Sequence, residues 1–146
     1  MVGAQKKSSD GPLLGIVVTM DLTGKIISTA QLGSFAASHI CPATDGTFWA
    51  LGQDWESELL STSRSSPLLR NYTTEGFLRR SYFPRNELPA AQINLHPKGQ
   101  TFTQNVADAY LSCGSTSVGA FVGLPDSWHW LEVQTQTGAA QHWTMK

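Results

Sequence analysis

Short apolar segments alternate with polar turns along most of the chain. Three times, an apolar segment of strand length leads into a polar turn that ends in glycine, and a second apolar segment follows. The three glycines are Gly24, Gly76 and Gly138. Side chains around them alternate with a period of two, which suits a strand better than a helix. Each copy therefore predicts a β-hairpin in which glycine supplies the positive φ of a tight turn.

A second pattern precedes two of these hairpins. Residues 39–52 predict a strand, a turn at Asp45-Gly46 and another strand, and residues 110–123 match them over the same length. Adding the glycine hairpins gives a unit of four short strands, with residues 54–66 as a loop insertion in the earlier copy. Four antiparallel strands per repeat are typical of a β-propeller blade.

These units predict an all-β fold of antiparallel four-stranded β-propeller blades. We expect a disordered N-terminal segment over residues 1–13 and a partial β-propeller over residues 14–146. The partial propeller divides into a half blade (14–32), a blade (36–83), a linker (84–107) rich in proline and glycine, and a blade (108–145). A propeller closes with 4–8 blades, so about two and a half blades leave it incomplete. We expect a C-terminal fragment of a longer protein; completion by a second copy is the alternative.

The sequence also resembles a known group of six- or seven-bladed propellers. His39 before an isoleucine, Asp45-Gly46 before Phe48-Trp49, and the turn ending at Gly76 resemble blades of the NHL, SMP-30 and streptogramin-lyase-like proteins. The repeats, the lack of a catalytic constellation and the low charge favour a non-catalytic scaffold or a binding and interaction module that is part of a longer protein. Its alternative is part of a propeller lyase or lactonase-like hydrolase whose metal ligands lie on missing blades. His39 and Asp45 would be the nearest candidates, but the magnesium-binding H-x-E pattern of the lyases has no counterpart here.

Composition narrows the expected partners. Charged residues make up 14% of the chain, and 10 Lys+Arg against 11 Asp+Glu leave a formal charge of −1, which argues against a nucleic-acid binder. No apolar run approaches the ~18 residues of a membrane helix, and no apolar stretch follows the N-terminal lysines as in a signal peptide. The compartment stays open, because a longer parent could be secreted. We expect a protein or small-molecule ligand, and self-association through exposed blade faces.

Histidines and carboxylates do not predict a catalytic or metal centre. The histidines are His39, His96, His129 and His142, and none has the spacing of a ligand set. His129 lies between Trp128 and Trp130, so strand alternation predicts an exposed His129 opposite the two indoles. Asp54, Glu56 and Glu58 alternate and could offer oxygens to calcium, but a solvated acidic loop is the preferred interpretation. We predict no catalytic, cofactor-binding or metal-ligating residue and no cofactor.

Half of the basic residues gather between positions 64 and 85, interleaved with aromatic residues: Arg64, Arg70, Arg79, Arg80 and Arg85, with Tyr72, Phe77, Tyr82 and Phe83. Such a surface could stack single-stranded nucleic acid or bind an anionic partner. However, Arg79 and Arg80 are adjacent on a predicted strand, so they should point to opposite faces. We therefore favour a solvated outer strand.

Cysteine and tryptophan have structural interpretations. Cys41 and Cys113 form no CxxC or zinc spacing, so we expect free, buried thiols, with a single bridge as the alternative. Trp49, Trp130 and Trp143 fall in predicted strands, where large rigid side chains would fill the space between packed sheets. A sugar-stacking platform is the alternative use of these indoles.

Overall fold

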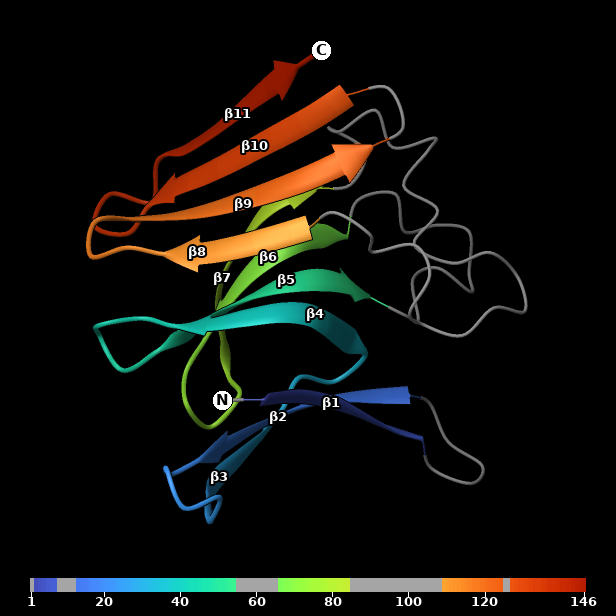
Figure 1. The fold of residues 1–146 in the computed structure, drawn as a ribbon, viewed down its shortest axis with the longest axis vertical. Helices are drawn as coiled ribbons and strands as arrows, with labels where there is room; N and C mark the ends of the chain where they lie inside the picture. The colour runs from blue at the N-terminus through green and yellow to red at the C-terminus, as the bar shows by residue number, and fades with distance from the viewer. Residues whose placement is uncertain (1, 8–12, 55–65, 85–108, 125–126) are drawn as a thin grey trace.

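Eleven β-strands build the part of the chain that the computed structural model describes: residues 2–7, 13–54, 66–84, 109–124 and 127–146. Their pairings are all antiparallel, and no helix forms in these residues, which confirms the all-β prediction. The strands form three sheets that follow one another along the chain and are stacked along the long axis of the molecule (Figure 1). The three sheets do not close into a ring.

The N-terminal sheet has three strands in the order β1 (Val2–Lys7), β2 (Leu13–Met20) and β3 (Ile26–Gln31). The prediction of disorder over residues 1–13 is wrong for β1, which pairs with β2 from Val2 opposite Val18 to Lys7 opposite Leu13. A short polar segment carries little strand signal of its own. Its backbone is ordered because β2 offers a row of N–H and C=O groups that need partners.

Two four-stranded sheets follow. The middle sheet has the order β4 (Phe35–Pro42), β5 (Phe48–Asp54), β6 (Pro67–Tyr72) and β7 (Leu78–Pro84). The C-terminal sheet has the order β8 (Ala109–Cys113), β9 (Ser117–Leu124), β10 (Ser127–Gln134) and β11 (Ala140–Met145). These bounds lie within one residue of the units expected at 36–83 and 108–145. The expected linker lies outside the described residues, apart from Pro84 at the end of β7.

The glycine turns form where the sequence places them. Gly24, Gly46, Gly76 and Gly138 all take positive φ, between 74° and 95°, in tight hairpin turns. Three of these turns share one backbone hydrogen bond, in which the first turn residue donates its N–H to the carbonyl four residues later. The donors and acceptors are Asp21 to Lys25, Ala43 to Thr47, and Thr73 to Phe77. This geometry is shared by turns of both sequence patterns, whereas in the Gly138 turn Gln134 donates its N–H to the Ala139 carbonyl, five residues later.

The middle sheet is buried on both faces. Four consecutive residues of β5, from Phe48 to Leu51, are buried although neighbours in a strand point to opposite faces. Phe48 and Ala50 belong to a core shared with the N-terminal sheet. Trp49 and Leu51 belong to a second core shared with the C-terminal sheet. The middle sheet thus depends on a neighbour at each side.

The two junctions between sheets are built alike. The first strands of successive sheets lie together, with β4 beside β1 and β8 beside β4. The turn between the third and fourth strands of each following sheet also packs on the last strand of the preceding one. A Cβ at Gly76 would lie 2.7 Å from the Gln31 carbonyl oxygen on β3, and a Cβ at Gly138 would lie 3.0 Å from the Tyr82 hydroxyl on β7. Glycine at these positions permits both the turn and the close approach.

A disulfide bond links the middle and C-terminal sheets. Cys41 on β4 is bonded to Cys113 on β8, with Cα atoms 6.0 Å apart, and the described residues contain no free cysteine. The expectation of two free thiols is therefore wrong. The separation of 72 residues hides the pairing in the sequence. Only the stacking of the two sheets brings their first strands within reach of one bond.

Removing this bond should destabilise the protein. A cross-link across so long a loop reduces the entropy of the unfolded chain, so we expect a Cys41→Ser, Cys113→Ser double variant to lose about 2–4 kcal/mol of unfolding free energy. Urea unfolding followed by tryptophan fluorescence measures this loss. Reductant should shift the midpoint of the unmodified protein and leave that of the double variant unchanged. Two alkylatable thiols in the native, unreduced protein would contradict the assignment.

Candidate ligand-binding cleft

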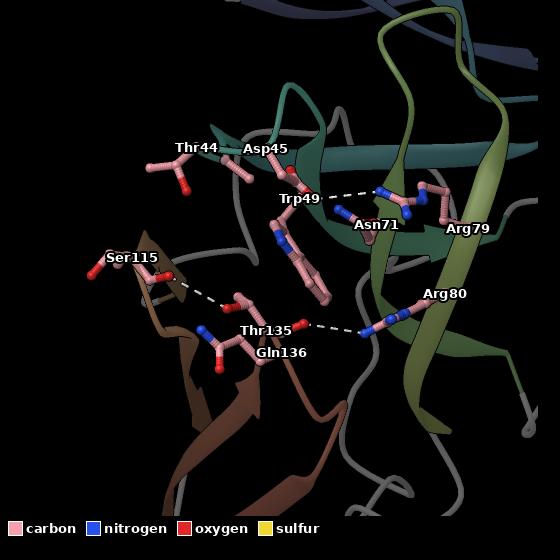
Figure 2. A pocket seen from close by; sticks show the side chains of 11 residues that line it. Thr44, Asp45, Trp49, Asn71, Arg79, Arg80, Ser115, Thr135 and Gln136 are labelled. Carbon is pink, nitrogen blue, oxygen red and sulfur yellow. Dashed lines mark hydrogen bonds and ion pairs between the residues drawn. The ribbon is translucent and has the colours of Figure 1, made fainter.

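A cleft of about 260 Å³ opens where the turns of the middle and C-terminal sheets meet. One wall comes from the β4–β5 turn and from β6 and β7, and the other from the β8–β9 and β10–β11 turns (Figure 2). The cleft is lined by Ala43, Thr44, Asp45, Trp49, Asn71, Arg79, Arg80, Gly114, Ser115, Thr135 and Gln136. Small and polar side chains dominate this lining.

Both arginines of β7 line this cleft, against the expectation that they point to opposite faces. The pairing of β6 with β7 shifts between Asn71 and Tyr72, which face Arg80 and Leu78 respectively, so Arg79 is an extra residue in β7. A bulge of this kind breaks the strict alternation of side chains and re-aims them. Figure 2 shows the two guanidinium groups extending from β7 toward the cleft. The two adjacent arginines are visible in the sequence and point to a cationic site. The bulge that directs both of them toward one cleft is not visible there.

The two arginines differ in their partners. Arg79 forms an ion pair with Asp45, with 3.3 Å between Nη1 and Oδ2. A hydrogen bond from the Thr47 hydroxyl is the main reason why the pKa of Asp45 is lowered, so this carboxylate stays charged beside Arg79. Arg80 instead donates to the backbone carbonyl of Thr135, 3.2 Å away on the C-terminal sheet. Among the described residues, Arg80 has no carboxylate partner.

The back of the cleft is held in place by buried groups. Asn71 is buried and donates its amide hydrogens to the Thr47 hydroxyl oxygen at 2.9 Å and the Phe48 carbonyl at 3.2 Å. Trp49 is also buried, with its ring 5.9 Å from that of Tyr82. Its predicted place in the core is confirmed, and one edge of it also reaches the cleft. These buried groups form the back of the cleft, beside the more exposed arginines of β7.

Other members of the predicted arginine cluster lie elsewhere. Arg70 is largely buried, pairs with Asp54 at 3.2 Å and lies over the Phe35 ring, 4.1 Å from its centre. The Asp54 side chain is 20% exposed and paired with a cation, so the preferred interpretation of a solvated position is wrong for this residue. Arg64, Arg85, Glu56 and Glu58 lie outside the described residues. The solvated outer strand that we favoured fails for Arg70, which sits on an inner strand between two sheets.

The two metal-ligand candidates implied by the resemblance do not converge. His39 lies within β4 and contacts the neighbouring Ser38 hydroxyl, whereas Asp45 lies in the turn beyond the end of β4 and pairs with Arg79. The strand from His39 to Pro42 alone spans about 10 Å, and Asp45 lies three residues further along the chain. In the part of the chain described, no three His, Cys, Asp or Glu side chains gather as a metal site. Among the described residues, His39 and Asp45 therefore do not form a magnesium site together.

His129 is fully buried, so the expectation of an exposed histidine is wrong. Strand alternation does put His129 and Trp128 on different faces of β10. However, the face that carries His129 also carries the core residues Leu131 and Val133. Its Nε2 lies 2.9 Å from the Ser127 hydroxyl and its Nδ1 lies 2.8 Å from Nε2 of His142. Burial, and to a lesser extent His142, lowers the pKa of His129. His96 lies outside the described residues.

Comparison of the chain with protein-family models, curated proteins and solved structures finds no match. Among the described residues, no helix is long and apolar enough to cross a membrane.

The buried histidine predicts a loss of stability in acid. The unfolded chain titrates this group near 6.5, whereas the folded protein holds it neutral to lower pH. The unfolded state therefore binds more protons as the pH falls below 6.5, and the free energy of unfolding decreases. Urea unfolding at pH 7.5 and pH 5 should show this decrease, and a His129→Gln variant should show a smaller one. Equal decreases in both proteins would contradict the prediction.

Proposed function

We propose that this chain is a non-catalytic binding module built from propeller-type blades, and that the cleft between its middle and C-terminal sheets binds a small ligand carrying an anionic group. The observation that carries the proposal is Arg80, a cation that lines the cleft without a carboxylate partner among the described residues. An arrangement of blades explains the position of the cleft, because the turns of neighbouring blades lie at the same end.

Propeller-type architecture is supported by the way in which the sheets follow one another. Successive four-stranded sheets with first strand beside first strand are the arrangement of blades around a common axis. The equivalent packing of the Gly76 and Gly138 turns supports the same relation at both junctions. In such an arrangement the turns of neighbouring blades gather at one end, where loops commonly form binding sites.

The cleft chemistry favours a carboxylate or phosphate group. A guanidinium presents several N–H donors in a planar fork that matches both anions. Arg80 uses one nitrogen on a neutral carbonyl, and Arg79 lies next to it with its charge shared with Asp45. Two arginines and one carboxylate leave an excess of one positive charge. The Ser115, Thr135 and Gln136 side of the cleft adds neutral polar groups for the rest of a small ligand.

Titration with inorganic phosphate and with succinate tests this site. Binding should shift the amide NMR signals of Ser115, Gln136 and Arg80 and the indole N–H signal of Trp49. An Arg80→Gln variant should bind at least about 10-fold more weakly, because a hydrogen bond to a charged group contributes about 1.5–3 kcal/mol.

A Lys25→Gln variant is the matched control, because it removes the same charge from a turn of the N-terminal sheet. Its affinity should equal that of the unmodified protein. Equally weakened anion binding in both variants would show that the net charge of the protein, and not a specific site, determines the affinity. Shifts confined to residues outside the cleft, or none with either anion, would overturn the proposed site.

A further inference from the structure

The C-terminal sheet carries a row of aromatic side chains on the face turned away from the middle sheet. The pairing places Tyr110 opposite Phe121, Phe121 opposite Trp130, and Trp130 opposite Trp143. Each of the four strands contributes one residue, so the row crosses the whole sheet. Tyr110 is 65% exposed and Trp143 is 43% exposed. The expected core position is therefore wrong for Trp143 within this chain.

This aromatic face is organised as a packing surface. Phe121 and Trp128 are stacked, with ring centres 4.8 Å apart and planes 14° apart. The Trp130 ring lies across Gly119, where a Cβ would come within van der Waals overlap of the indole. Trp49 packs in a similar manner, where it fills the junction between the middle and C-terminal sheets. Exposed apolar patches of this kind mark interaction sites.

At the opposite end of the molecule, the outer face of the N-terminal sheet carries apolar side chains on β2 beside the polar Thr29 and Gln31 on β3. Val17 of β2 is buried in the core shared with the middle sheet. Alternation puts Ile16 and Val18 on the other face of the N-terminal sheet, and both are only partly buried. Among the described residues, each end of the stack of three sheets in Figure 1 thus has an outer face with exposed or partly buried apolar side chains.

We propose that the aromatic face of one copy docks on the free face of the N-terminal sheet of a second copy, and that the reverse contact closes a ring of two chains. This inference rests on the propeller-type architecture proposed above, but not on the anion site. The occupant follows from continuity with the junctions inside the chain. At each junction, one sheet receives the next sheet in the sequence on one of its faces. The aromatic face is the receiving face of the last sheet, and the Val18 face is the docking face of the first.

The number of copies follows from the number of sheets. Propellers close with 4–8 blades. The described residues of one chain supply three sheets and those of two chains supply six, whereas those of three chains would supply nine. A head-to-tail contact forms a closed ring when its rotation closes. Two copies of the described sheets therefore give a number within the range of closed propellers.

Sedimentation equilibrium of the unmodified chain should give a dimer. Trp143→Lys on the aromatic face and Val18→Lys on the opposite face should each raise the dimer dissociation constant about 30-fold or more, the effect expected for a central interface side chain. Leu22→Lys is the control, because it replaces a fully exposed apolar residue in a turn outside both faces, and it should leave the dimer intact.

Mixing the two defective variants provides the discriminating measurement. A mixed dimer has both substitutions in one junction and none in the other, so it should associate more tightly than either variant alone. This gain also shows that both variants are folded. A monomeric unmodified chain, larger polymers, or a dimer sensitive to Trp143→Lys but not to Val18→Lys would overturn the proposal. Phosphate binding is also measured on a monomeric variant. This measurement tests the anion site by itself, so a failure of the dimer proposal can be told apart from a failure of the cleft proposal.

Discussion

The structure depends on a middle sheet that is apolar on both faces. A sheet of this kind is not stable when one face is open to water, because burying a large apolar side chain contributes roughly 1.5–3 kcal/mol. Phe48 and Trp49 are neighbours in one strand, yet each lies in a different core. The positions of the N-terminal and C-terminal sheets follow from this requirement. The Cys41–Cys113 bond strengthens one of the two resulting junctions.

The stacking of sheets also forms the polar cleft. No single sheet contains the cleft, because its walls come from turns of two sheets. Arg80 spans the junction by bonding to Thr135, so the same side chain joins two sheets and lines a polar cavity. The bulge in β7 makes this arrangement possible by directing neighbouring arginines toward one cleft. A site of this origin would respond to any change in the angle between the sheets.

The ends of the stack follow the same physical rule as its centre. Each sheet has two faces, and three sheets can cover only four of the six faces. The two remaining faces carry apolar residues, such as Val18 at one end and Trp143 at the other. Polar side chains would be the ordinary choice for faces in contact with water. The apolar side chains at both ends are the basis for the contact that we propose with a second chain.

The sequence alone determined the local elements, because hairpins depend on nearby residues. The turns at Gly24, Gly46, Gly76 and Gly138 follow from the need for positive φ, and the flanking strands follow from apolar alternation. Burial of Trp49 was predictable for the same reason. The tertiary structure alone decided the strand at residues 2–7, the disulfide bond and the burial of His129. It also decided how Arg79 and Arg80 meet, since the bulge arises from pairing with β6. Each of these features depends on contacts between segments that are distant in the chain or on the register of a paired strand, and no short sequence pattern records such contacts.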